Sequence, residues 1–262
     1  MILRRVIAHF RKQEWAAIFI DFVIVVVGVF VGIQVSNWNQ AQADKRLGRA
    51  YAERLTADLQ KDLVSRRALA DYYGAVLDSV ERTNALLAEP QSDPQELVVS
   101  AYRASEVNYG PQTRATWDEI VSSGASRLLP RAAVEIGIAD YYAADTARFA
   151  FDSVADTAYR HRVRTILPLE IQKAMRAGCS DLRNEVQEIV GFMPDCTLHV
   201  DPDLIAATAA ALRADPAVQA ELRYQYSDVF SARTNISGDA VFLERALAAL
   251  RGTEAPAAED AP

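Results

Sequence analysis

The pattern of apolar and polar residues begins with one long apolar run close to the N-terminus. The run covers residues 15–35, WAAIFIDFVIVVVGVFVGIQV, and its only ionisable side chain is Asp21. As an α-helix, a run of this length extends about 30 Å, which is the thickness of the hydrocarbon layer of a bilayer. The pattern therefore predicts one N-terminal transmembrane helix over 15–36.

A cleaved signal sequence is the alternative to an uncleaved anchor. Residues 41–43, Ala-Gln-Ala, have the small-x-small form of a cleavage site. The apolar run is longer than the roughly 7–15 residues typical of signal peptides. It also continues into Asn37, Trp38 and Asn39, a polar and aromatic end that suits a membrane interface. We therefore favour the anchor.

The residues that flank the run predict its orientation. Segment 1–14 is a short basic leader, and positive residues in short leaders stay on the cytoplasmic side. Its basic residues are Arg4, Arg5, Arg11 and Lys12. Long domains after a span cross the membrane largely regardless of their charge. We expect a bacterial inner-membrane protein with a cytoplasmic N-terminus and a periplasmic C-terminal domain.

The net charge argues against a nucleic-acid partner. The chain has 28 basic and 35 acidic side chains. Without the leader cations, Glu14 and Asp21, 24 basic and 33 acidic side chains remain, a net charge of −9 outside the membrane. Surfaces that bind nucleic acid are basic. We therefore expect the lipid bilayer and other protein chains as partners, and no nucleic acid.

Asp21 shares one face of the predicted span with Val25, Gly28 and Gly32. At about 100° per residue, both glycines lie within about 20° of the aspartate around the helix. They form a G-x-x-x-G pattern, which allows two helices to approach closely in lipid. The face predicts a transmembrane interface, with a second copy of the chain in a homodimer or with another membrane protein. The alternatives are an Asp21 that is neutral or hydrated near the inner leaflet, and an Asp21 that transfers ions.

The ion-transfer hypothesis rests on a resemblance. Residues 19–27, FIDFVIVVV, resemble the single spans of ion-driven stator and energy-transducing subunits, which also carry one early aspartate. The resemblance covers about a dozen residues and implies an ion-coupled or sensory membrane subunit that uses Asp21. The rest of the chain does not continue it.

Residues 37–89 predict a long juxtamembrane helix. Leucine and tyrosine first recur every four residues, and from Leu69 to Leu87 the apolar steps alternate between four and three, as in a coiled coil. This stripe either pairs with a second copy or packs on the helices that follow, and we favour the second. The positions assigned to the solvated face include Glu53, Arg54, Asp58, Lys61, Asp62, Arg66 and Arg67.

Residues 93–251 predict an extracytoplasmic helical bundle without strands, so that the fold class is all-α. Asp93-Pro94 and Asp215-Pro216 each combine a capping residue with a first-turn proline. The expected helices cover 94–108, 113–123, 131–166, 169–177, 181–190 and 216–250. The acidic Pro/Ala-rich segment 252–262 predicts a disordered tail.

Two segments carry a second resemblance. The end of the span, GVFVGIQVSNWN over 28–39, and the segment TWDEIVSSG over 116–124 resemble a bacterial family of uncharacterised single-span proteins. Residues 127–129 (Arg-Leu-Leu) and Tyr141-Tyr142 extend the similarity. The resemblance implies an inner-membrane protein with a helical periplasmic domain, and it implies no catalytic residues.

Cys179 and Cys196 are the only cysteines of the chain. A pair of cysteines in a domain outside the cytoplasm predicts a disulfide. The alternative is a metal site that uses both cysteines with His199 and the nearby Asp201 and Asp203. A single C-x-x-H lacks the second ligand pair of known zinc modules, so we expect no metal.

The densest basic cluster of the domain contains Arg160, His161, Arg162 and Arg164. It is a candidate anion-binding patch, and a solvated charged helix face is the alternative. Phosphate loops, dinucleotide fingerprints and H-E-x-x-H motifs are absent from the sequence. We therefore expect no catalytic residues and no cofactor. The sequence favours a non-enzymatic, membrane-anchored interaction or assembly module over an ion-coupled subunit or an enzyme of unfamiliar type.

Overall fold

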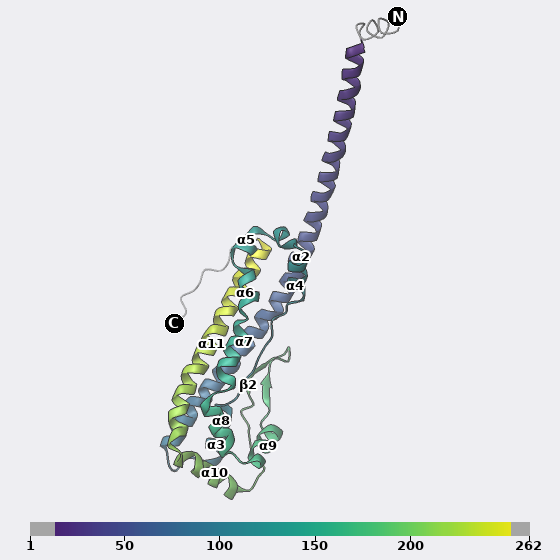
Figure 1. The fold of residues 1–262 in the computed structure, drawn as a ribbon. Coiled ribbons are helices and arrows are strands. Elements are labelled where there is room, and N and C mark those ends of the chain that lie inside the picture. The colour runs from purple at the N-terminus through teal and green to yellow at the C-terminus, as the bar shows by residue number, and fades with distance from the viewer. Residues whose placement is uncertain (1–13, 253–262) are drawn as a thin grey trace, which may run out of the picture. The chain divides into compact units, whose positions relative to one another are not determined.

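The structure is a computed structural model that describes residues 14–252, and the chain divides into two compact units, Met1–Tyr51 and Ala52–Pro262. One helix, α2 (Glu14–Ala88), begins in the first unit and ends in the second (Figure 1). The two segments predicted as 15–36 and 37–89 are therefore parts of one uninterrupted helix. The leader before Glu14 and the tail after Gly252 lie outside the described residues.

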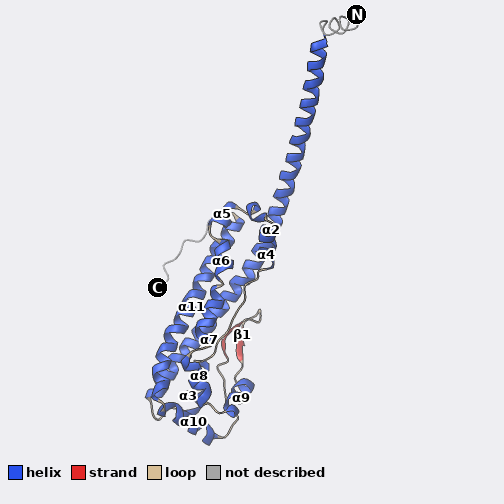
Figure 2. Cartoon of the chain, in the orientation of Figure 1, coloured by secondary structure: helices blue, strands red, loops and turns tan. Residues whose placement is uncertain are grey.

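Within residues 52–252, the regular elements are helices apart from one small hairpin (Figure 2). This confirms the all-α class in its main feature. The elements after α2 are α3 (Pro94–Arg103), α4 (Ala115–Ser122), the 3₁₀ turn η1 (Ala125–Leu128), α5 (Arg131–Glu135), α6 (Ile138–Ala144), α7 (Thr146–Ala155), α8 (Ala158–Ile166), α9 (Leu169–Gly178), β1 (Asp181–Arg183), β2 (Ile189–Phe192), α10 (Pro202–Ala214) and α11 (Pro216–Arg251).

The C-terminal part of α2 runs through the core of this unit. Near Leu69 and Val76 it packs with α7 and with α11 residues such as Val229. From Val80 to Leu86 it joins a second cluster, built from α3, α8, α9, α10 and the first part of α11. The coiled-coil stripe is therefore used for packing within the chain. This confirms the interpretation that we favoured, because side chains buried in their own domain are not available to a second copy.

Capping signals predicted several helix starts correctly. Asp93 accepts a hydrogen bond from the Gln95 backbone N–H at 3.1 Å, and Asp215 accepts one from Ala217 at 3.0 Å. Helix α10 was missed although Asp201-Pro202 repeats the same signal, and Asp201 caps it in the same way. A side chain that bonds to its own backbone two residues later acts locally, so sequence alone can reveal it.

The predicted helix over 131–166 is wrong, because the chain forms four helices there. Gly137 adopts φ 92° and Asp145 adopts φ 39°, left-handed conformations that end a helix. The Asp145 side chain then caps α7, and the Thr157 side chain caps α8. The helix predicted over 94–108 also ends earlier, at Arg103.

The predicted helix over 181–190 is also wrong, because β1 and β2 form an antiparallel hairpin there. Asn184 Oδ1 accepts hydrogen bonds from the backbone N–H groups of Val186 and Glu188, and Gln187 adopts φ 69°. An asparagine that bonds to its following backbone favours a turn over a helix. The physical reason for the error is therefore this local turn.

Candidate functional site

The predicted transmembrane face lies on the first part of α2. Asp21, Val25, Gly28 and Gly32 are all helical and exposed. A Cβ atom built on Gly28 or Gly32 would meet no heavy atom within 4 Å. Nothing in the described part of the chain covers this face at its glycines. It is therefore open to the close approach of another helix.

Two buried charged residues of α2, one acidic and one basic, interrupt its apolar stripe in the second unit. Asp62 and Arg66 are almost completely buried, although the sequence assigned both to the solvated face. The assignment is wrong because both residues belong to a continuous seam that steps by four and three. The seam residues are Leu55, Leu59, Asp62, Arg66, Leu69, Tyr73, Val76 and Val80. Extending the heptad upstream of Leu69 would have placed both charges in the core.

Each charge of this pair has specific partners. Arg66 Nη1 donates to the Gly110 carbonyl at 2.7 Å, and Arg66 Nε lies 3.4 Å from Asp239 Oδ2 on α11. Asp62 accepts from the Thr113 backbone N–H and from the Tyr141 hydroxyl, both at 2.9 Å. Burial raises the pKa of the Tyr141 hydroxyl, which therefore stays protonated as a donor. These contacts join α2, α6, α11 and the irregular segment before α4.

Three of the residues that carry the second sequence resemblance, Trp117, Tyr141 and Tyr142, lie around this network. The Trp117 ring stacks on Tyr142 with centroids 5.0 Å apart and an interplanar angle of 9°. Tyr141 stacks on Phe242 of α11 at 5.7 Å. Arg114 donates to the Tyr142 carbonyl. Tyr141 contacts Asp62 directly, and the other residues have a structural role in holding Tyr141 and Tyr142 in place.

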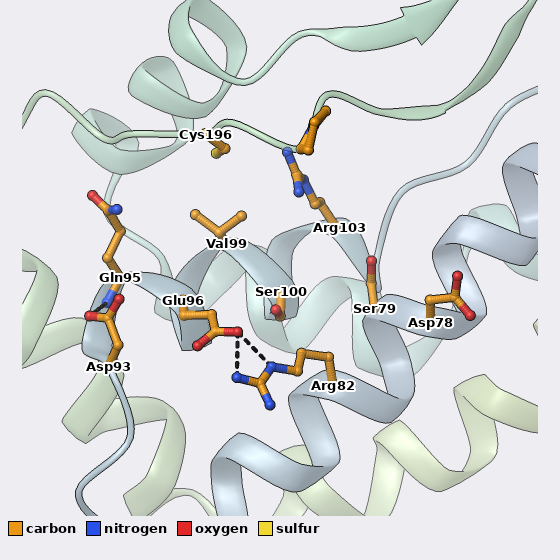
Figure 3. Close-up of a pocket in the computed structure, with 11 residues that line it drawn as sticks. Asp78, Ser79, Arg82, Asp93, Gln95, Glu96, Val99, Ser100, Arg103 and Cys196 are labelled. Carbon is orange, nitrogen blue, oxygen red and sulfur yellow. Dashed lines mark hydrogen bonds and ion pairs between the residues drawn. The ribbon is translucent and has the colours of Figure 1, made fainter.

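A polar cavity of about 460 Å³ lies between α2, α3 and the loop after β2 (Figure 3). Arg82 Nε donates to Glu96 Oε1 at 2.6 Å across the cavity, and Asp93 at one end caps α3. Ser79 donates to its own helix, to the Ala75 carbonyl. Asp78 adds a third acid. Acidic and basic groups are nearly balanced here, and most already have partners, so the cavity is suited to hydrogen bonding.

Arg103 forms the wall of this cavity that faces the loop. Its Nη2 donates to the Met193 carbonyl at 2.7 Å, and its guanidinium lies 5.2 Å from the centroid of the Phe192 ring. Burial lowers the pKa of Arg103. Sequence reasoning did not single out this residue. Its role depends on a loop about 90 residues away, which no local pattern reveals.

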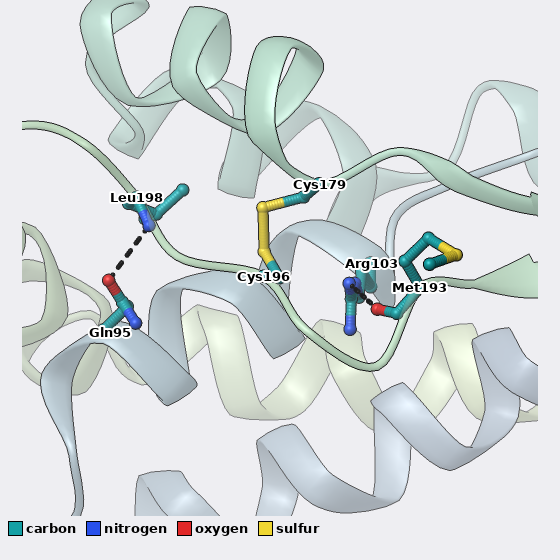
Figure 4. Close-up of a disulfide and its surroundings, with 6 residues drawn as sticks. All are labelled: Gln95, Arg103, Cys179, Met193, Cys196 and Leu198. Carbon is teal, nitrogen blue, oxygen red and sulfur yellow. Dashed lines mark hydrogen bonds between the residues drawn. A yellow bond between two sulfur atoms is a disulfide. The ribbon is translucent and has the colours of Figure 1, made fainter.

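The predicted disulfide is present and holds the same loop (Figure 4). Cys179 follows α9 and Cys196 lies in the loop, with Cα atoms 4.8 Å apart. Two residues beyond Cys196, the Leu198 backbone N–H donates to Gln95 Oε1 of α3 at 3.0 Å. The rival metal site loses its thiolate ligands, because both sulfurs are joined to each other.

The four members of the basic cluster each have a partner within the domain. Arg160 donates to the Ser105 carbonyl, and His161 pairs with Asp156. Arg162 forms ion pairs with Asp215 at 3.1 Å and Glu221 at 2.7 Å, and Arg164 pairs with Glu106 at 2.9 Å. The cluster therefore does not form one free anion-binding patch. Its side chains point to different partners, which favours the alternative of a charged helix face for Arg162 and His161.

Glu106 is the acid that sequence reasoning missed. It is buried and accepts from Arg164, and Arg176 of α9 lies 3.3 Å away. The Arg164 guanidinium also lies over the Tyr102 ring, 3.4 Å from its centroid. Glu106 lies beyond the end of α3, in a segment without regular secondary structure, although the sequence predicted that the helix would continue to residue 108. Only the packing of α8 and α9 against α3 brings these residues together.

Comparison with known proteins gives one family match. The family, described as a "Family of unknown function (DUF6090)", matches residues 21–159, just over half of the chain. The matched region begins at Asp21 and includes the buried pair on α2 and the aromatic residues around it. No curated protein and no solved structure matches the chain.

Proposed function

Since the chain belongs to the DUF6090 family of unknown function, we propose that it is a single-span protein of the bacterial inner membrane. In this proposal its periplasmic helical domain is a non-enzymatic interaction or assembly module. One observation carries the proposal. The most apolar window of α2 has a mean hydropathy of 2.7, and none of it is buried within the described residues. A helix this apolar and uncovered is suited to lipid.

The orientation is supported by two features on opposite sides of the span. The basic leader favours a cytoplasmic N-terminus. The disulfide between Cys179 and Cys196 suits an oxidising compartment such as the periplasm. Cleavage after residues 41–43 would cut α2 within a continuous helix that enters the core of the second unit. This supports an uncleaved anchor.

The proposed interaction uses the face of Asp21, Val25, Gly28 and Gly32. An ionised aspartate facing lipid costs about 2.5–3.5 kcal/mol at the centre of a span, and contact with a second helix reduces this exposure. The two glycines leave room for that helix, because the space where their Cβ atoms would be is empty. A homodimer through this face is the simplest assembly, and another membrane protein is the alternative partner.

In-cell disulfide crosslinking of single cysteines tests this face. Val25→Cys should crosslink strongly, whereas Val23→Cys and Phe30→Cys, on the opposite face, should not. The native disulfide can remain, because its two sulfurs are already joined. Adding Gly28→Leu and Gly32→Leu should abolish most crosslinking at position 25, since bulky side chains separate the helices.

The matched control adds two leucines with the same spacing to another face, as Val27→Leu and Val31→Leu. This control should crosslink at position 25 as the parent does. Equal crosslinking from positions 23, 25 and 30 would refute a specific self-interface. The absence of any crosslink at these positions would refute the homodimer and direct the search to copurified membrane proteins.

A further inference from the structure

A shallow groove of about 540 Å³ lies on the second unit where α8 and α9 pack on α3. It is separate from the cavity beside the disulfide loop. The residues that line it are Tyr102, Arg164, Leu169, Gln172, Lys173, Arg176 and Ala177. Its volume is within the range of about 300–1,000 Å³ that small-molecule sites occupy.

The groove has more positive than negative groups. Three cations line it, Arg164, Lys173 and Arg176. The acids that meet them are Glu106, which both arginines contact, and Asp181, which interacts electrostatically with Arg176. Three cations therefore face two acids, a surplus of one positive charge in a chain of net negative charge.

The remaining surface of the groove is apolar. The Tyr102 ring is buried beneath the Arg164 guanidinium, and stacking on that ring fixes the orientation of the guanidinium. Leu169 is exposed on the rim although it is a large apolar side chain, and Ala177 lies at the other end of α9. Gln172 donates to the carbonyls of Arg164 and Leu167 at the end of α8. These two carbonyls therefore do not compete with a ligand for the cations of the groove.

We propose that this groove binds a monoanionic amphiphile, a carboxylate carried on a single alkyl chain. Lys173 and Arg176 are the exposed cations, and they bind the carboxylate, while the exposed Leu169 contacts the chain. The single surplus charge matches one carboxylate. The cavity of Figure 3 does not have this character, because three acids line it against two arginines. The proposal goes beyond the proposed membrane interaction and does not depend on the span.

Calorimetric titration of the full chain in lipid nanodiscs with octanoate tests the proposal, with empty nanodiscs subtracted. The variant Lys173→Ala with Arg176→Ala should weaken octanoate binding by about tenfold or more, because it removes the accessible cations. Both side chains are exposed, and Arg164 still pairs with the buried Glu106 in this variant, so we expect it to keep its fold. The control variant Lys61→Ala with Arg223→Ala removes two exposed cations outside the groove, and its affinity should stay within about twofold.

Three further ligands and one variant test separately whether the groove recognises the negative charge and whether it contacts the alkyl chain. Octylammonium has the same chain with the opposite charge and should not bind in the groove. Acetate lacks the chain and should bind far more weakly than octanoate, and Leu169→Ser should weaken octanoate binding. Equal binding of octanoate and octylammonium, or an unchanged affinity in the Lys173/Arg176 variant, would overturn the proposal. Equal binding of octyl glucoside would overturn it as well, because that ligand has no charge.

Discussion

Replacing Arg66 with methionine should lower the free energy of unfolding by about 3–5 kcal/mol. Methionine is similar in size, so the change removes charge and hydrogen bonds more than volume. It leaves Asp239 in the core without its opposite charge and the Gly110 carbonyl without its donor. Breaking one partner of a buried ion pair is costly because the other charge remains desolvated. Urea unfolding followed by Trp117 fluorescence, in a background with Trp15→Phe and Trp38→Phe, measures the loss.

The adjacent residue offers a matched control. Arg67 forms an ion pair with Glu244, which lies on α11 as Asp239 does, but the Arg67 side chain is 60% exposed. Arg67→Met should therefore cost less than about 1 kcal/mol, as exposed ion pairs contribute little. If Arg66→Met cost no more than Arg67→Met, the buried contacts of Arg66 with Asp239 and Gly110 would not stabilise the fold.

The cost of Arg66→Met should also depend on pH. Burial raises the pKa of the Asp239 carboxyl, while Thr146 and Arg66 oppose the rise. Without Arg66 the pKa rises further above its unfolded value. A group that binds its proton more tightly in the folded state loses stability as pH rises above its unfolded pKa of about 3.8. The loss in the free energy of unfolding caused by Arg66→Met should therefore be larger at pH 7.5 than at pH 4.5. Urea unfolding of the parent and the variant at both pH values measures this difference.

Removing the disulfide with Cys179→Ala and Cys196→Ala should lower the free energy of unfolding by about 3 kcal/mol. The bond closes a loop with a sequence separation of 17, and the chain-entropy relation for a loop of this size gives that value. The loop opposite α3 should also exchange its amide hydrogens faster, particularly the Leu198 N–H that bonds to Gln95. Urea unfolding and hydrogen exchange of the oxidised parent and the variant measure both effects.

A reducing agent provides the control for this experiment. Reduction of the parent protein should reproduce the loss of stability, and it should leave the variant unchanged. Hydrogen exchange of the Asp62–Arg66 network should stay close to that of the parent under native conditions, since the disulfide does not touch it. A parent whose stability is the same with and without reduction would contradict a stabilising role for the bond.

The candidate sites differ in how far sequence patterns predict them. Asp21, Val25, Gly28 and Gly32 were grouped correctly on one exposed helix face, because helical periodicity alone determines that grouping. The predicted anion patch of Arg160, His161, Arg162 and Arg164 was not found as a unit. Counting basic residues along the chain does not show which acids they meet, and the acids lie up to about 60 residues away.

The sequence by itself determined the features that depend on a few neighbouring residues. These are the apolar run of α2, the helix starts at Asp93 and Asp215, and the single possible cysteine pair. Only the tertiary structure decided that Asp62 and Arg66 are buried, that Glu106 lies beneath two arginines, and that α2 uses its heptad stripe within its own domain. The physical reason is that a charge can be buried only where a distant segment supplies its partner. Hydropathy and capping act over a few residues, whereas Arg66 meets Gly110 and Asp239 only after the helices have packed.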